Sequence, residues 1–168
     1  MYCDVFDGTR AVIAQGIADK NRIAIMGASF GGYLAICGVT FEPDLYCCAI
    51  SEVGVFDWKR QLRSKLLNYN NYVYDYYKPY VGSNEYLDSI SPIHWVKNIK
   101  APVFLAGGYE DLTVSSYQSY SLYNKLQLAG VKVEIFIRGG EGHGFFNQKN
   151  ITEYNKRVVQ FLDKYMNN

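Results

Sequence analysis

The strongest constraint on the fold comes from residues 27–31, which read Gly-Ala-Ser-Phe-Gly. They directly follow a short apolar run at residues 22–26, typical of a buried strand, and lead into a segment expected to be helical, residues 31–40. A serine on such a tight strand-to-helix turn has its hydroxyl lifted clear of the sheet, at the positive end of the helix dipole. We expect that a side chain at residue 27 or residue 31 would collide across the turn, which accounts for the glycines Gly27 and Gly31. The pattern predicts a nucleophilic serine, Ser29.

Two other interpretations of this run are open. It could be a structural glycine-rich turn that happens to contain a serine, or a loop that binds phosphate. Phosphate-binding loops follow the patterns G-x-x-x-x-G-K-[ST] or G-x-G-x-x-G, and neither is present here. The nucleophile interpretation requires a base and an acid elsewhere in the chain.

Short apolar runs alternate with helical patterns along the rest of the chain. This alternation is typical of a parallel sheet with helices on both faces, so the predicted class is α/β with about four strands. The other expected strands are residues 46–50, 102–106 and 131–137, and the other expected helices are residues 4–16, 115–129 and 151–166.

Length and charge narrow the function further. With 168 residues and neither repeats nor a low-complexity linker, the chain fits one domain, residues 1–168. A net charge of +1, without runs of like charge, argues against nucleic acid or an anionic membrane as the main partner. No apolar stretch approaches the roughly 20 residues that cross a bilayer, and the N-terminus lacks a signal-peptide pattern, so we expect a cytoplasmic protein.

The cysteines give no reason to expect a metal or a cofactor. Their spacing fits neither a zinc site nor a C-x-x-C redox motif. We expect all four to be reduced and to act as small core residues: Cys3, Cys37, Cys47 and Cys48.

A serine hydroxyl is a poor nucleophile until a base removes its proton, so the turn at Ser29 predicts a histidine. The chain has two. His143 lies in a glycine-rich loop after the last predicted strand, at the sheet edge where Ser29 also lies, whereas we expect His94 to be a surface or packing residue. Asp111 follows the strand at residues 102–106 and is a candidate to orient the imidazole, with Glu110 as its rival. Serine, aspartate and histidine then follow in the chain order that hydrolases with this turn use.

At these residues the chain resembles the catalytic domain of the prolyl oligopeptidase family of serine peptidases. The family places its aspartate three residues before a valine, which selects Asp111 over Glu110. It often has His-Gly where this chain has Gly107 and Gly108, and tyrosine where this chain has Phe30. The segments that carry the resemblance are residues 22–33, 91–92, 99–103, 108–114 and 141–145.

The resemblance implies an α/β-hydrolase fold, of which this chain is the C-terminal portion. The backbone N–H of Phe30 would be one donor of the oxyanion hole, and the family takes its second donor from upstream residues. The first strand present would expose an unpaired edge, so we expect either the missing N-terminal part of the domain or a second copy of the chain to cover it.

Residues 54–99 contain no obvious strand and are rich in tyrosine. Such an excursion is either a functional loop or a helical insertion whose tyrosines pack on the scaffold. In the family, the matching segment lines the pocket for the residue before the scissile bond with aromatic side chains. The candidate substrate-binding residues are therefore Trp58, Tyr74, Tyr76 and Tyr77, which would suit a proline ring or another compact apolar group.

These observations favour a serine peptidase that hydrolyses short peptides through an acyl-enzyme. Two alternatives are open: an esterase similar to carboxylesterases or dienelactone hydrolases, which share the triad and its chain order, or an inactive, truncated domain that acts only in assembly. Cleavage specificity and oligomeric state do not follow from the sequence.

Overall fold

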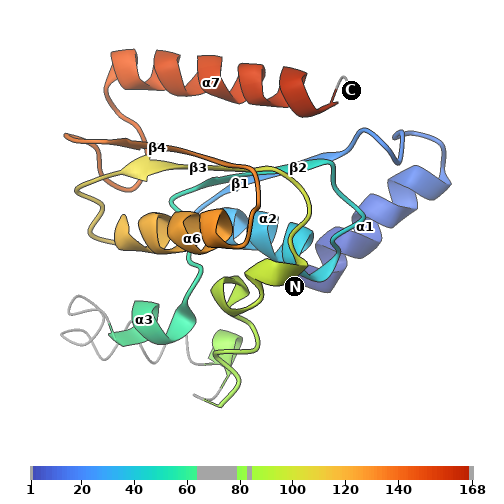
Figure 1. Ribbon diagram of the computed structural model, residues 1–168, viewed down its shortest axis with the longest axis horizontal. Helices are drawn as coiled ribbons and strands as arrows, with labels where there is room; N and C mark the ends of the chain where they lie inside the picture. The colour runs from blue at the N-terminus through green and yellow to red at the C-terminus, as the bar shows by residue number, and fades with distance from the viewer. Residues whose placement is uncertain (1, 64–78, 83–84, 167–168) are drawn as a thin grey trace.

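The computed structural model describes residues 2–63, 79–82 and 85–166. Their centre is a four-stranded parallel sheet in the order β1-β2-β3-β4 (Figure 1). The strands are β1 (Ala24–Ala28), β2 (Cys48–Glu52), β3 (Val103–Gly108) and β4 (Val133–Arg138). The expected α/β class with four parallel strands is confirmed.

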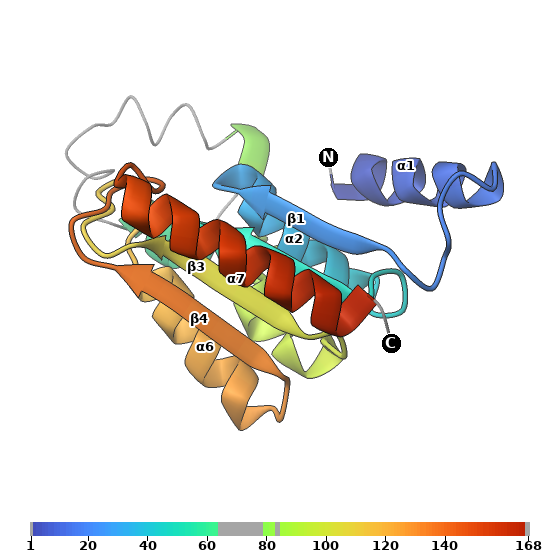
Figure 2. The ribbon, with the colours of Figure 1, turned by 90° about the horizontal axis from the view of Figure 1, so that it is seen from above.

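Helices cover both faces of this sheet. Figure 1 places α2 and α6 on one face and α7 on the other, and Figure 2 shows α7 running across the sheet with α1 to the side of β1. The bounds of the helices are α1 (Tyr2–Ala14), α2 (Phe30–Phe41), α3 (Trp58–Arg63), α6 (Tyr117–Leu128), α7 (Gln148–Met166) and the short 3-10 helices η1 (Pro92–His94) and η2 (Val96–Asn98).

Alternation along the strands divides the core into two layers. Ala49 of β2 and Leu105 of β3 pack into the layer under α2 and α6, whereas Ile50 and Phe104 pack into the layer under α7. All four side chains are almost fully buried. Because both faces are covered, the central strands β2 and β3 are buried on both sides, which explains why they appear in the sequence as continuous apolar runs. The outer strands β1 and β4 are only partly buried.

Only some of the four cysteines are buried in these layers. Cys37 in α2 and Cys48 in β2 are buried, and burial raises the pKa of each thiol to about 12, so neither is a reactive thiolate at neutral pH. Cys47 is partly buried. The expectation that all four are core residues is wrong for Cys3, which is exposed on α1, a helix that buries only Phe6.

The register of the sheet brings the segments after the strands together. Ala28 pairs with Glu52, and Glu52 pairs with Ala106, so β1, β2 and β3 end side by side. Gly108 of β3 pairs with Arg138 at the end of β4. The turn after β1 and the loops after β3 and β4 therefore start from one edge, as a parallel sheet requires.

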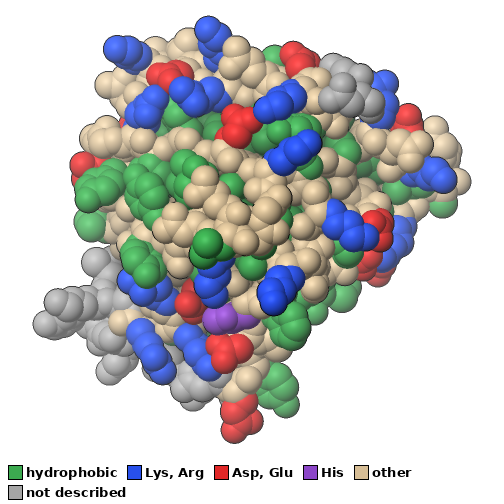
Figure 3. All heavy atoms as spheres, in the orientation of Figure 1, with side chains coloured by type: hydrophobic (Ala, Val, Ile, Leu, Met, Phe, Trp, Pro, Cys, Tyr) green, Lys and Arg blue, Asp and Glu red, His purple; other side chains and the backbone are tan. Residues whose placement is uncertain are grey.

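Residues 54–99 contain short helices and no strand in their described part. Tyr33 of α2 links this region to the sheet layers, because its hydroxyl donates to the carbonyl of Ile90 at 3.0 Å. Basic and acidic side chains are interspersed on the face shown in Figure 3. No helix in the described part of the chain is long and apolar enough to cross a membrane.

Candidate active site

Ser29 occupies a strained turn between β1 and α2. Its φ is 55° and its ψ is −118°, in a region that non-glycine residues rarely adopt and that costs about 1–3 kcal/mol. Its N–H donates to the Glu52 carbonyl at 2.9 Å, and its carbonyl accepts the Tyr33 N–H at 3.0 Å. These two bonds fix the turn to β2 on one side and to the first turn of α2 on the other.

Gly27 and Gly31, on either side of Ser29, differ in whether an added Cβ would collide with the turn. A Cβ on Gly27 would lie 2.4 Å from the Gly31 carbonyl carbon and oxygen, far inside van der Waals contact, so the expected collision is confirmed there. A Cβ on Gly31 would meet no described atom within 4 Å, so the same expectation is wrong for Gly31. Its space is open because the turn brings the backbone of Gly31 towards residue 27, and its own Cβ direction points away.

The structure brings the three predicted polar side chains into one chain of hydrogen bonds. His143 Nε2 lies 2.9 Å from Ser29 Oγ, and His143 Nδ1 lies 2.8 Å from Asp111 Oδ2. A carboxylate acceptor at Nδ1 selects the tautomer with its proton on that nitrogen. The Nε2 lone pair is then left to accept the serine hydroxyl, which is what a general base needs.

Asp111 is held more firmly than the imidazole that it faces. Its carboxyl is fully buried, and its Oδ1 accepts the backbone N–H groups of Thr113 at 2.8 Å and Val114 at 2.9 Å. The His143 side chain is 30% exposed. The buried carboxylate therefore has both oxygens occupied and can orient the ring without moving.

Glu110, the rival of Asp111, has a different partner. Its Oε2 accepts the Gly140 N–H at 2.8 Å, and its own N–H donates to the Glu141 carbonyl at 3.1 Å. Glu110 therefore ties the loop after β3 to the loop that carries His143, which agrees with the choice of Asp111 as the partner of the imidazole.

Glu141 is a buried carboxylate, 1% exposed, two residues before His143. It accepts the Phe146 N–H at 2.7 Å and the Asn147 N–H at 3.1 Å, and the Asn150 side chain donates to it at 2.7 Å. These bonds, that from the Phe146 N–H first, lower the pKa of Glu141 below its ordinary value. Glu141 thereby fixes the His143 loop to the start of α7. No feature of the sequence singles out this role for Glu141, because two of its three partners are backbone N–H groups.

We expect Glu141→Gln to lower the free energy of unfolding, because an amide nitrogen cannot accept these N–H groups. Since the pKa of Glu141 is lowered by folding, its stabilising contribution is complete above its ordinary pKa of 4.5 and is lost as the pH falls through the lowered value. The difference between wild type and variant should therefore shrink below pH 4.5. Denaturant unfolding at pH 7 and at several lower values measures it, and a difference that does not change with pH would contradict the assignment.

Glu52 is the other carboxyl close to the imidazole. Burial raises its pKa, while the Tyr154 hydroxyl and the field of His143 act in the opposite direction. Its Oε1 would lie 3.8 Å from a Cβ on Gly144, next to His143. Glu52 therefore borders the His143 loop from the end of β2.

Phe30 begins α2, and an N–H in the first turn of a helix has no acceptor within its own helix. That N–H is therefore available to donate a hydrogen bond to an oxyanion that develops on a substrate carbonyl.

A small cavity of about 40 Å³ opens beside Ser29. Trp58, predicted as a substrate-binding residue, lines it and is 2% exposed. Tyr74, Tyr76 and Tyr77 lie outside the described residues. Sequence reasoning missed Val55 and Gln61, which carry no motif, and did not assign Thr113 and Val114 of the motif at residues 108–114 to a pocket. The described residues that line the cavity are Ser29, Phe30, Val55, Trp58, Gln61, Thr113 and Val114.

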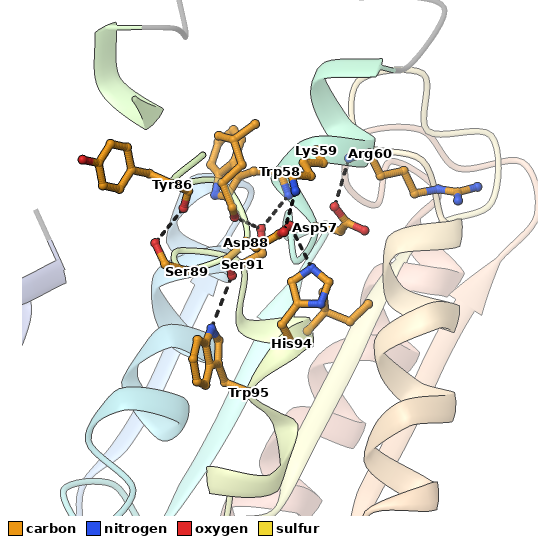
Figure 4. A network of polar contacts seen from close by, with 12 residues as sticks. Asp57, Trp58, Lys59, Arg60, Tyr86, Asp88, Ser89, Ser91, His94 and Trp95 are labelled. Atoms are coloured by element: carbon orange, nitrogen blue, oxygen red, sulfur yellow. Dashed lines mark hydrogen bonds and ion pairs between the residues drawn. The ribbon is translucent and has the colours of Figure 1, made fainter. Parts of the chain in front are cut away.

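His94 is a surface residue, as expected. It is exposed, and its Nε2 lies 3.4 Å from Asp88 Oδ1. Figure 4 shows His94 and Lys59 both pointing towards Asp88. No group of three or more histidine, cysteine, aspartate or glutamate side chains in the described residues could hold a metal ion.

A parallel sheet that presents a serine on a strained strand-to-helix turn, with the segments after its later strands at the same edge, is an α/β-hydrolase fold. Within that class, the chain belongs to the prolyl oligopeptidase family, whose model matches residues 1–168.

Known proteins of this family resemble the chain over nearly its whole length. Dipeptidyl aminopeptidase BIII of Pseudoxanthomonas mexicana is 27% identical over 96% of this chain and 24% of its own. The prolyl endopeptidase of Dictyostelium discoideum is 27% identical over 99% and 23%. The solved acylaminoacyl peptidase of Pyrococcus horikoshii has a TM-score of 0.86 at 27% identity, over 98% and 28%. The chain therefore spans about a quarter of the length of these relatives.

Proposed function

We propose that this chain supplies the catalytic triad of a peptidase that acts on short peptides, with Ser29 as nucleophile, His143 as base and Asp111 as the residue that orients it. The observation that carries the proposal is the unbroken chain of hydrogen bonds at 2.9 and 2.8 Å between these three side chains. Family membership supports the general chemistry, and the geometry supports the assignment of these residues.

The three side chains and the Phe30 N–H divide the steps of the reaction between them. As the Ser29 oxygen attacks the substrate carbonyl, its proton passes to His143 Nε2, and the Asp111 carboxylate stabilises the imidazolium that forms. The Phe30 N–H donates to the carbonyl oxygen as it becomes an oxyanion. His143 then gives the proton to the leaving amine, which leaves an acyl-serine. Water then attacks this ester while His143 accepts its proton. His143 returns the proton to the Ser29 oxygen as the ester bond breaks, which releases the product carboxylic acid and free Ser29.

The cavity beside Ser29 supports a preference for a compact apolar residue before the scissile bond. Its walls include the Trp58 indole and the side chains of Val55 and Val114. An apolar cavity of about 150 Å³ can hold benzene. A cavity of about 40 Å³ therefore suits a side chain of a few atoms.

We propose that further polypeptide completes the site on the open side of the sheet. In the described residues β1 pairs only with β2, and Met26 of β1 is 52% exposed. The relatives are about four times longer than this chain, which supports the remainder of the same domain as the polypeptide that pairs with β1. The alternative is a second copy of the chain. A missing oxyanion donor would cost about 10²–10³-fold in turnover.

A fluorophosphonate probe tests the nucleophile in the full-length protein that contains this chain. We expect the wild-type protein to be labelled and Ser29→Ala to be unlabelled, with Ser115→Ala, an exposed serine of the same protein, as the matched control that keeps labelling. Labelling that survives Ser29→Ala would remove the assignment. A comparison of an aminoacyl anilide with a short acyl nitrophenyl ester then separates a peptidase from an esterase, which should cleave only the ester.

A further inference from the structure

Two cavities of very different size share one wall. The pocket beside Ser29 has a volume of about 40 Å³, and a second cavity has about 550 Å³. Among the residues that the structure describes, Gln61 alone lines both of them. The Gln61 side chain on α3 therefore stands between the proposed acyl pocket and a much larger space.

Gln61 is held in that position. It is 8% exposed, and its Nε2 donates to the Thr113 carbonyl at 2.8 Å. Thr113 also lines the small pocket, and its N–H is bound by Asp111. The hydrogen bond therefore ties α3 to the loop that carries the acid of the triad, and the glutamine side chain bridges the two walls of the pocket.

The larger cavity differs from the pocket in chemistry as well as in size. The pocket is mainly apolar, whereas charged side chains line the cavity. Lys59 Nζ lies 2.5 Å from Asp88 Oδ2, and the Arg60 guanidinium carbon lies 3.4 Å from the centroid of the Tyr117 ring. Among the described residues of the lining, three side chains are basic (Lys59, Arg60 and Arg63) and two are acidic (Asp57 and Asp88). This part of the lining therefore carries a small positive excess and suits a long polar or acidic group.

We propose that Gln61 is a specificity-determining residue, the partition that restricts the acyl residue of the substrate to a small side chain by closing the pocket off from the charged cavity. The proposal rests on the proposed function of Ser29. It assigns the natural substrate to peptides with a residue such as alanine before the scissile bond. It also implies that a shorter side chain at residue 61 connects the pocket with the charged cavity, so that glutamate fits before the scissile bond.

The test uses the full-length protein and peptidyl anilides that differ only in the acyl residue, alanine against leucine, glutamine or glutamate. For the wild type we expect kcat/KM to fall at least about tenfold from alanine to each longer residue, since one misfitting methylene already discriminates by 10–200-fold. For Gln61→Ala we expect the ratio of alanine to glutamate to decrease at least about tenfold. Gln61→Met, of similar length, should keep the wild-type preference because it keeps the partition.

The outcomes separate this inference from the proposed function. Fluorophosphonate labelling of Ser29 reports on the triad whatever the acyl residue is. Normal labelling combined with a wild type that prefers leucine or glutamate would overturn the role of Gln61 and leave the triad standing. So would a folded Gln61→Ala variant with unchanged preferences. If Gln61→Ala does not fold, the wild-type series and Gln61→Met still decide, because a changed preference in Gln61→Met contradicts the partition.

Discussion

Replacing His143 by alanine is expected to lower kcat/KM for a peptide anilide by about 10⁴-fold or more in the full-length protein. The imidazole is the base that faces Ser29 Oγ, at 2.9 Å, and without it the hydroxyl keeps its proton at neutral pH. Asp111→Asn should cost a similar factor, because an amide at this position favours the tautomer with the proton on the wrong ring nitrogen. Steady-state rates and the rate of fluorophosphonate labelling measure both effects.

His94→Ala is the matched control for this experiment. His94 is exposed, and its contact with Asp88 is a surface contact of a kind that contributes little to stability. We expect kcat/KM to change by less than about twofold. If His94→Ala lost activity and His143→Ala retained it, the base would have been assigned to the wrong histidine.

The parts of the fold that could be predicted are those with a local cause. The central strands β2 and β3 are buried on both faces and are therefore continuous apolar runs. Ser29 lies in a glycine-containing run between an apolar segment and a helical pattern, which is typical of a strand-to-helix turn. The expected strand at 46–50 begins at Cys48 instead, because the sheet ladder starts where Ala24 and Cys48 pair. That boundary depends on a partner strand more than 20 residues away.

The site was predictable to the extent that chain order reports position in a parallel sheet. His143 and Asp111 follow successive strands, so both reach the same edge as Ser29. The pocket was not predictable in the same way, because Val55 and Gln61 lie in a segment whose path is set by tertiary contacts such as the bond from Gln61 to the Thr113 carbonyl. Glu141 was missed because two of its three partners are backbone N–H groups, which the sequence does not display.

Gly27→Ala is expected to be the most damaging small substitution at the turn. The new Cβ would lie 2.4 Å from the carbonyl carbon and oxygen of Gly31 and 2.9 Å from its Cα. All three are backbone atoms, so no side chain can swing away, and the turn itself must move. Overpacking of this kind typically costs about 1–3 kcal/mol and occasionally more. We expect a lower free energy of unfolding and loss of probe labelling, since the same movement displaces Ser29 Oγ from His143.

For Gly31→Ala, at the other glycine of the same motif, we expect the opposite effect on stability. Its Cβ would enter space that is open within the described residues, and Gly31 lies in α2, where alanine is favoured over glycine by about 0.5–1 kcal/mol. We therefore expect the free energy of unfolding to stay the same or rise slightly. Denaturant unfolding and probe labelling of the two variants, measured side by side in the full-length protein, give the comparison. Equal tolerance of both substitutions would show that contact across the turn does not determine its geometry, whereas a folded Gly31→Ala variant without labelling would show that substrate or further polypeptide occupies the open space.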